Sequence, residues 1–188
     1  MLRDLDGDGE PEVVLDLNLG GAHCCAWWRV YRFDRRRGRY VARAKFWGDD
    51  AADPRTRDLN GDRRPEFVSR DERFAYAFTS YAGSAMPIRI WWYRRGVFSD
   101  VTRRFPNQIR ADAAYLWRLY LQYRKQDARG ILPAWAADEY LLGRGRVVDT
   151  ALRAAARAGY LESECEPRQA AAYIREVKAF LRGKGYVK

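Results

Sequence analysis

The chain has 188 residues, of which 47% are hydrophobic and 14% aromatic, and its 35 basic and 25 acidic residues give a formal net charge of +10. This composition is that of a folded protein with one ordinary domain or two small ones, which excludes a disordered chain. No run of about 18 apolar residues is present that could cross a membrane as a helix.

The excess of positive charge raises the question of a nucleic-acid partner. The basic residues are spread along the chain, and only Arg35-Arg36-Arg37 forms a run, in a predicted turn. No nucleic-acid-binding motif accompanies the charge. We therefore expect no nucleic-acid partner, and a basic binder of anionic polymers, with steep salt dependence, stays an alternative function.

The first element is an acidic loop, followed at once by strand-forming residues. Its side chains carry oxygen at relative positions 1, 3, 5 and 9, with glycines at 4 and 6 and proline at 8. Alternate residues of a tight loop point inward, and calcium takes six to eight oxygen ligands. The pattern predicts a calcium loop whose ligands are the side chains of Asp4, Asp6, Asp8 and Glu12 and the Glu10 carbonyl.

Only residues 1–3 precede this loop, which leaves no room for an export signal or for a strand before the loop. We therefore expect a truncated or late-started form of a longer precursor, whose missing part contained the export signal. After the loop, residues 12–17, 25–33 and 39–46 are predicted strands of a three-stranded meander, with turns at 18–21 and 34–38. The third strand places four residues on one face: Tyr40, Ala42, Ala44 and Phe46.

A second loop begins 54 residues after the first and repeats its spacing. The corresponding ligands are the side chains of Asp58, Asn60, Asp62 and Glu66 and the Arg64 carbonyl. This loop should bind more weakly, because Asn60 lowers the ligand charge, Arg63 replaces a glycine, and both Arg63 and Arg64 add positive charge.

The residues after the second loop retrace the first repeat. Residues 66–69, 88–93 and 97–105 match its three strands, and Gly96 matches the turn glycine Gly38. The sequence thus predicts an internal duplication, with repeats at 1–48 and 55–105. Two such sheets cannot close on themselves, so another part of the chain or a partner must cover their open faces.

The two loops are not EF-hands, which need a glutamate at loop position 12, where this chain has Leu15 and Ser69. Their pattern resembles the FG-GAP or VCBS repeat, the calcium-loop blade of integrin-α-like β-propellers found in many bacterial extracytoplasmic proteins. Glutamate rather than the usual aspartate stands at relative position 9 in both copies. The resemblance implies propeller-blade-like repeats, bound Ca2+ and a secreted or cell-envelope location.

Residues 106–188 have helical patterns throughout. Apolar residues recur at helical spacing in four segments: Ile109, Ala113, Leu116, Tyr120 and Tyr123 in a helix ended by Gly130; residues 135–142; Val148, Leu152 and Ala155; and Ala170, Ile174, Val177 and Leu181. We expect each apolar stripe to pack on a neighbouring helix or on the sheets rather than to bind a ligand. The predicted fold class is α+β, with two antiparallel β-meander repeats in 1–105 and a helical domain in 106–188.

The segment Gly20-Gly21-Ala22-His23-Cys24-Cys25 is similar to one in bacterial proteins of the calcium-loop type. In an oxidising compartment, Cys24 and Cys25 could bond each other, or one of them could bond Cys165. His23 is the only histidine, and no further metal-binding spacing supports a transition-metal or catalytic site through it.

Residues 69–81 form the other candidate site, because they are longer than their counterpart in the first repeat. Phe74, Tyr76 and Phe78 are predicted to face the core; alternatively, with Trp91 and Trp92, they form a carbohydrate- or peptide-binding face. Asp71 and Glu72 are a candidate acid pair of a hydrolase of cell-envelope polymers, although neighbouring carboxylates in a strand diverge.

The sequence as a whole favours an extracytoplasmic calcium-binding β-repeat module with a structural ion. We expect it to act in binding or scaffolding, with an unidentified protein or polysaccharide partner, rather than in catalysis.

Overall fold

The computed structural model describes residues 1–188 except 22–23, 49–51, 163–168 and 188. The chain folds into two compact units. The β unit comprises Met1–Glu72 and Arg89–Thr102, and the helical unit comprises Arg73–Ile88 and Arg103–Lys188. These units do not coincide with the ranges 1–105 and 106–188, because Arg73–Ile88 packs with the helices.

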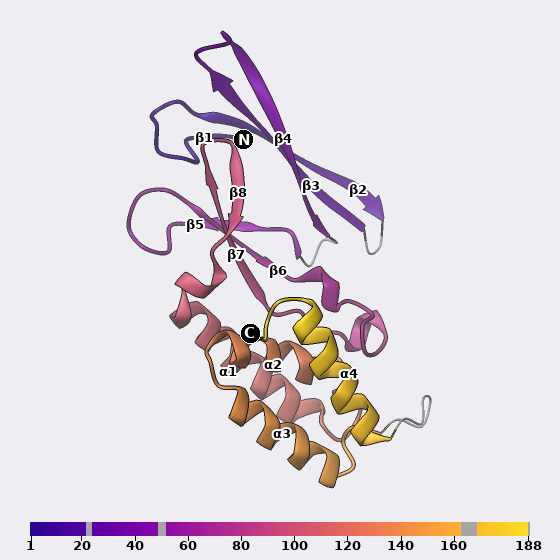
Figure 1. Cartoon of the computed structure of the whole chain (residues 1–188). Coiled ribbons are helices and arrows are strands. Elements are labelled where there is room, and N and C mark those ends of the chain that lie inside the picture. Colours follow the sequence, from indigo (N-terminus) through magenta and orange to yellow (C-terminus); the bar gives the residue numbers. More distant parts are fainter. Residues whose placement is uncertain (22–23, 49–51, 163–168, 188) are drawn as a thin grey trace. The chain divides into compact units, whose positions relative to one another are not determined.

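The β unit contains two four-stranded antiparallel sheets (Figure 1). In the first sheet the strands follow chain order: β1 (Leu2–Arg3), β2 (Glu12–Gly21), β3 (Cys24–Asp34) and β4 (Arg39–Gly48). The second sheet has the same order: β5 (Arg55–Arg57), β6 (Glu66–Arg70), β7 (Ile88–Arg94) and β8 (Val97–Asp100). In neither sheet do the described strands close into a barrel.

The two sheets share one strand register. Arg3 pairs with Glu12 across β1 and β2, and Arg57 pairs with Glu66 across β5 and β6. Each acidic loop therefore joins the first two strands of its sheet. The prediction of three strands per repeat is wrong, as is the expectation that no strand precedes the first loop, because β1 pairs with β2.

Two boundaries also differ from those predicted. Residues 18–21 are not a turn, because β2 continues to Gly21, which pairs with Cys24 across an irregularity in the register. The strand predicted at 97–105 ends at Asp100. The Asp100 carboxylate accepts hydrogen bonds from the Thr102 backbone N–H (2.9 Å) and hydroxyl (2.6 Å), which turns the chain into a short 3₁₀ helix, Thr102–Arg104.

An aromatic core lies between the two sheets. The ring of Phe67 on β6 lies 5.5 Å from that of Trp28 on β3 and 5.9 Å from that of Trp47 on β4. Trp91 and Tyr93 of β7 belong to the same core. Its fully buried members come from both sheets, so the sheets stabilise each other mainly by removing apolar area from water.

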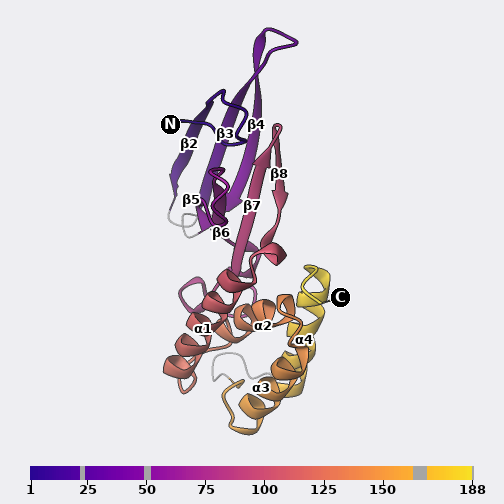
Figure 2. The ribbon, with the colours of Figure 1, turned by 90° about the vertical axis from the view of Figure 1, so that its left-hand side faces the viewer.

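The helical unit has four helices (Figures 1 and 2): α1 (Pro106–Tyr123), α2 (Ile131–Leu141), α3 (Gly145–Arg157) and α4 (Ala170–Gly183). The predicted stripes are buried, except that Ala170 and Ile174 are half-buried and Tyr123 is exposed. Gly130 does not end α1 but precedes α2, where a Cβ atom would clash with the Gly83 carbonyl oxygen. None of the described helices has the length and apolar character to cross a bilayer.

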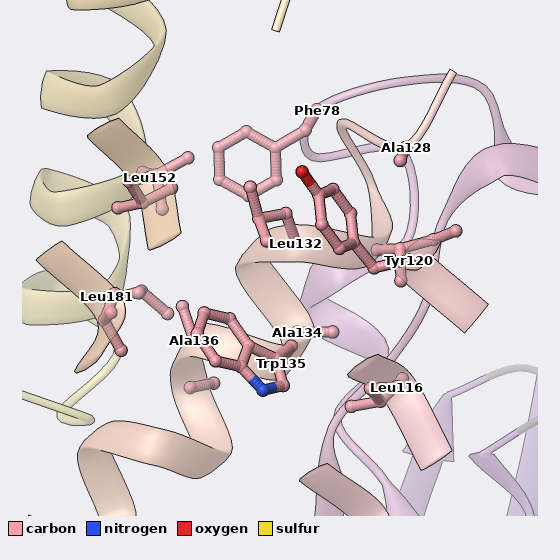
Figure 3. Close-up of a cluster of buried hydrophobic side chains, with 14 of the residues drawn as sticks. Phe78, Leu116, Tyr120, Ala128, Leu132, Ala134, Trp135, Ala136, Leu152 and Leu181 are labelled. Carbon is pink, nitrogen blue, oxygen red and sulfur yellow. The ribbon is translucent and has the colours of Figure 1, made fainter. Parts of the chain in front are cut away.

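The core of the helical unit surrounds α2, which is buried over nine consecutive residues. Figure 3 shows Trp135 and Leu132 of this helix among side chains of the other helices. Phe74 and Phe78 are buried in the same core, as predicted. Tyr76 is 60% exposed, contrary to prediction, because residues 72–78 form a 3₁₀ helix and turn, in which Tyr76 has φ 59°, rather than a strand.

We expect Phe67→Ala to lower the free energy of unfolding of the β unit by about 3–5 kcal/mol, because it removes a ring that is fully buried between the sheets. Urea unfolding followed by near-UV circular dichroism would measure this loss. Tyr40→Ala, at a 51% exposed position of the first sheet, is the control and should cost little. Equal losses in the two variants would contradict the inter-sheet core.

Candidate metal centre

The first acidic loop folds around the carboxylate of Asp4. The two Asp4 oxygens accept hydrogen bonds from the backbone N–H groups of Gly7 (2.6 Å) and Gly9 (3.0 Å), and Asp8 accepts one from Glu10 N–H (3.0 Å). Both glycines have positive φ, as the spacing predicted. One carboxylate oxygen from each of Asp4, Asp6 and Asp8 lies within 4.8 Å of the others.

The second loop repeats this hydrogen-bonding scheme. Asp58 accepts from Gly61 N–H (2.8 Å) and Arg63 N–H (2.9 Å), and Asp62 accepts from Arg64 N–H (2.8 Å). Arg63 adopts φ 64°, the left-handed conformation for which the first loop uses glycine. The two loops are therefore the same structure built from different residues.

A buried glutamate ties each loop to the strand that follows it. Glu12 is 1% exposed and accepts a hydrogen bond from Leu5 N–H (2.8 Å), and Glu66 is 0% exposed and accepts one from Leu59 N–H (2.7 Å). These are the glutamates at relative position 9. Each uses one oxygen to hold the second residue of its loop, which leaves the other oxygen for a further donor or a cation.

The loops differ in what that other oxygen contacts. In the second loop, Glu66 Oε1 accepts a hydrogen bond from the Trp92 indole N–H (2.9 Å). Among the described residues, no donor bonds Glu12 Oε1 or the buried Oδ1 of Asp6. A buried acceptor without a donor costs stability, so the first loop has two inner oxygens suited to a cation. The donor set, entirely of oxygen, fits a hard ion such as calcium.

Arginine side chains on the third strand of each sheet partly neutralise the loops. Arg32 Nε lies 3.1 Å from Asp6 Oδ2 and 3.7 Å from Glu12 Oε1, and its Nη2 lies 2.5 Å from Asp8 Oδ2. In the second sheet, Arg94 lies farther from Asp62 and Glu66, at 3.7 and 3.8 Å. Arg32 is therefore a cation held by the same carboxylates that would hold a metal.

The second sheet also contacts the first loop. The Arg95 backbone N–H donates to Asp6 Oδ2 (3.1 Å), and Arg94 Nη1 donates to the Leu5 carbonyl (3.1 Å). The side chain of Arg64 lies so close to Gly7 that a Cβ atom there would clash with it. Both sheets thus contact the buried part of the first loop, Leu5 and Asp6, although Asp8 and both glycines of this loop are exposed. In the second loop Asp58, Asn60 and the glycine are exposed.

Burial raises the pKa of the Glu12 carboxyl from 4.5 to about 7. The Leu5 N–H hydrogen bond opposes this shift, and the nearby carboxylates of Asp6, Asp8 and Asp4 add to it. At Asp8 the Glu10 N–H hydrogen bond and Arg32 lower the pKa, against the effect of burial. Close to neutral pH the Glu12 carboxyl is therefore partly protonated, and a cation bound there would displace that proton.

The other sequence-predicted sites lose some of their residues to the protein interior. Phe74 and Phe78 are buried in the helical core and cannot form part of a ligand face, whereas Trp91 and Trp92 are half-buried and Tyr76 is exposed. Asp71 is 4% exposed and paired with Arg89 at 3.0 Å, which leaves it unsuited to acid–base catalysis.

Cys25 is disulfide-bonded. His23 and the side chains of Cys24 and Cys165 lie outside what the structure describes, so the choice between the two predicted pairings stays open.

Sequence reasoning missed Arg32, Arg94 and Trp92, because their approach to the loops depends on strand register. A signal was present. The dipeptide Tyr-Arg occurs in the aromatic strand of each repeat, as Tyr31-Arg32 and Tyr93-Arg94, and the residue before it is Val30 in one copy and Trp92 in the other. The valine side chain has no N–H, so it cannot give Glu12 the hydrogen bond that the Trp92 indole gives Glu66.

No protein-family model and no solved structure matches the chain. A protein of Synechocystis sp. named "Probable thylakoid lumen protein" is 33% identical over 147 residues, which are 76% of this chain and 43% of that protein. The chain thus spans less than half the length of this relative.

We expect Glu12→Gln to remove a pH dependence of stability in the metal-free protein. The folded-state pKa of about 7 lies above the ordinary 4.5, so the folded state holds the proton more tightly and stability falls as pH rises between these values. Relative to the variant, the wild type should lose on the order of 3 kcal/mol between pH 4.5 and 7. Urea unfolding in chelator at several pH values measures this, and parallel pH profiles would contradict it.

Proposed function

We propose that this chain is an extracytoplasmic calcium-binding β-repeat module of the FG-GAP or VCBS type that acts in binding or scaffolding, with calcium as a structural ion. The observation that carries the proposal is the pair of buried carboxylate oxygens in the first loop, Asp6 Oδ1 and Glu12 Oε1, for which no described residue supplies a donor. Asp4, Asp6, Asp8 and Glu12 would hold the ion through their side chains.

The second loop would hold calcium weakly or only at high concentration. Asn60 Oδ1 already accepts a hydrogen bond from Asp62 N–H (2.9 Å), and both oxygens of Glu66 have protein donors. A cation would have to compete with these donors, whereas in the first loop it would satisfy Asp6 Oδ1 and Glu12 Oε1, which have no donor among the described residues.

The scaffolding part of the proposal is supported by the outward face of the first sheet. Leu17 on β2 pairs with Trp27 on β3, which pairs with Phe46 on β4, and these side chains are 44%, 39% and 38% exposed. The rings of Trp27 and Phe46 lie 4.8 Å apart. Such a row of apolar side chains on one sheet is typical of an association surface.

The repeat itself indicates what this face would bind. By register, Val13 on the outward face of the first sheet corresponds to Phe67 in the second sheet, since their partners are Leu2 and Thr56 at equivalent positions. Phe67 packs against the first sheet. In the second sheet this face is covered by the β-repeat that precedes it, the first sheet. We therefore propose that another β-repeat covers the outward face of the first sheet.

The extracytoplasmic location draws on the relative from Synechocystis, whose name places it in the thylakoid lumen. A disulfide at Cys25 is consistent with an oxidising compartment. Calcium is also available as a structural ligand outside the cytoplasm at concentrations that suit extracellular modules.

We expect saturating calcium, but not magnesium, to raise the melting temperature by roughly 4–8 °C relative to chelator, because the ion binds only the folded state. Asp6→Asn gives the first loop the residue that the second loop has at this position and should abolish the shift. Asp62→Asn is the matched control in the second loop and should keep most of it. A shift that survives Asp6→Asn, or none in the wild type, would contradict a calcium site in the first loop.

If the outward face of the first sheet is an association surface, the isolated chain should self-associate through it when its natural occupant is missing. Sedimentation velocity should then show oligomers whose share rises with protein concentration. Trp27→Glu should return the chain to a monomer, whereas Tyr115→Glu, at a 48% exposed position of α1, should not. Identical behaviour of the wild type and Trp27→Glu would argue against this surface.

A further inference from the structure

The helical unit contains a groove that the proposed function does not use. A cavity of about 800 Å³ lies between α1, α2 and α3. Its apolar lining includes Trp117 of α1 and the buried Trp135 of α2, whose ring centroids are 4.7 Å apart. Ala114 of α1 and Ala151 and Ala154 of α3 also line it, and their short side chains leave the space between the helices open. A cavity of this size and lining is typical of a small-molecule site.

The charged residues of the lining are three arginines and one glutamate: Arg110, Arg144, Arg146 and Glu139. Glu139 is 6% exposed and forms an ion pair with Arg144, with contacts of 2.6 and 2.9 Å, so these two charges offset each other. Arg110 donates only to the neutral amide of Asn107 (2.6 Å) among the described residues, and no described carboxylate pairs with Arg146. Two guanidinium groups therefore remain available to an anion.

The positive charge lies at one end of the groove. Arg110 follows the first turn of α1, Arg146 lies in the first turn of α3, and both helices run in the same direction in the two views (Figures 1 and 2). Trp117 and Ala154 lie two turns farther along their helices. The N-termini of both helices are thus at the arginine end, where their dipoles add to the positive potential.

We infer that this groove binds an amphipathic anion, with a carboxylate-type head on Arg110 and Arg146 and a flat or aliphatic apolar body over Trp117 and Trp135. Guanidinium groups bind carboxylates by paired hydrogen bonds, which gives the head both affinity and orientation. The apolar body would gain by covering indole rings and alanine methyl groups that now border open space. A cation of the same shape would meet the arginines and be rejected.

The test is isothermal titration calorimetry of the whole chain with decanoate, and with decylammonium and decan-1-ol as probes of equal chain length. Decanoate should bind at one site, decan-1-ol at least tenfold more weakly, and decylammonium not measurably. The double variant Arg110→Glu/Arg146→Glu should weaken decanoate binding by at least tenfold. Arg118→Glu/Arg153→Glu, which changes one exposed arginine on each of the same two helices outside the groove, should leave binding within about twofold.

A second variant separates the groove from the apolar face of the first sheet. Ala151→Trp should block the groove and abolish decanoate binding, with circular dichroism confirming that the helices are intact. The inference is overturned if decanoate does not bind, if it binds no better than decylammonium, if both double variants weaken it equally, or if Trp27→Glu rather than Ala151→Trp abolishes it. None of these results depends on calcium, so the groove and the calcium loop succeed or fail separately.

Discussion

Each repeat of the β unit depends on one buried glutamate, Glu12 or Glu66, that accepts a hydrogen bond from the loop it follows. A carboxylate with almost no exposure is unfavourable unless donors or cations surround it. Satisfying that group fixes where the loop turns and where the next strand begins, and thereby sets the register that the two sheets share. The aromatic core can then assemble, because register decides which face of each strand carries its large side chains.

The two repeats solve this constraint in different ways. The second repeat surrounds Glu66 with protein donors, the Leu59 N–H and the Trp92 indole, and replaces one loop carboxylate with Asn60. The first repeat keeps its acidic residues and brings Arg32 against them, yet leaves two oxygens without donors. One duplicated scaffold thus carries one loop whose buried glutamate is satisfied by protein donors and one with two buried oxygens that have no donor among the described residues. Under the proposed function, a structural ion would act at the latter loop, which both sheets contact.

Local features were predictable from sequence, and features that depend on register were not. The spacing of Asp4, Asp6 and Asp8 and the positive φ of Gly7 are set within a few residues, so the loops and the duplication could be inferred directly. The helical stripes were equally clear. The position of Arg32 over the first loop was not, since it requires the pairing of β2 with β3. The exposure of Tyr76 was not predictable either. The alternating aromatic residues suggested a strand with Tyr76 on its buried face, but the chain forms a 3₁₀ helix and turn there.

The relation between the two sheets also has a direction. A two-fold dimer buries the same face of both partners, so no further copy can be added. Here the inner face of the first sheet packs against a different face, the Phe67 face of the second sheet. The outward face of the first sheet corresponds by register to the Phe67 face, and its large apolar side chains are exposed. An interface of this kind contains nothing that limits the number of sheets it can join. The number of sheets that join must then be limited by residues that differ between the repeats. Arg29, which stands between Leu15 and Ala44 on the outward face, is such a residue, since burying its charge without a partner would be costly. If the outward face is covered by a further β-repeat as proposed, a copy of this chain without that neighbour would expose a surface prone to aggregation, so the supply of the two would have to be matched.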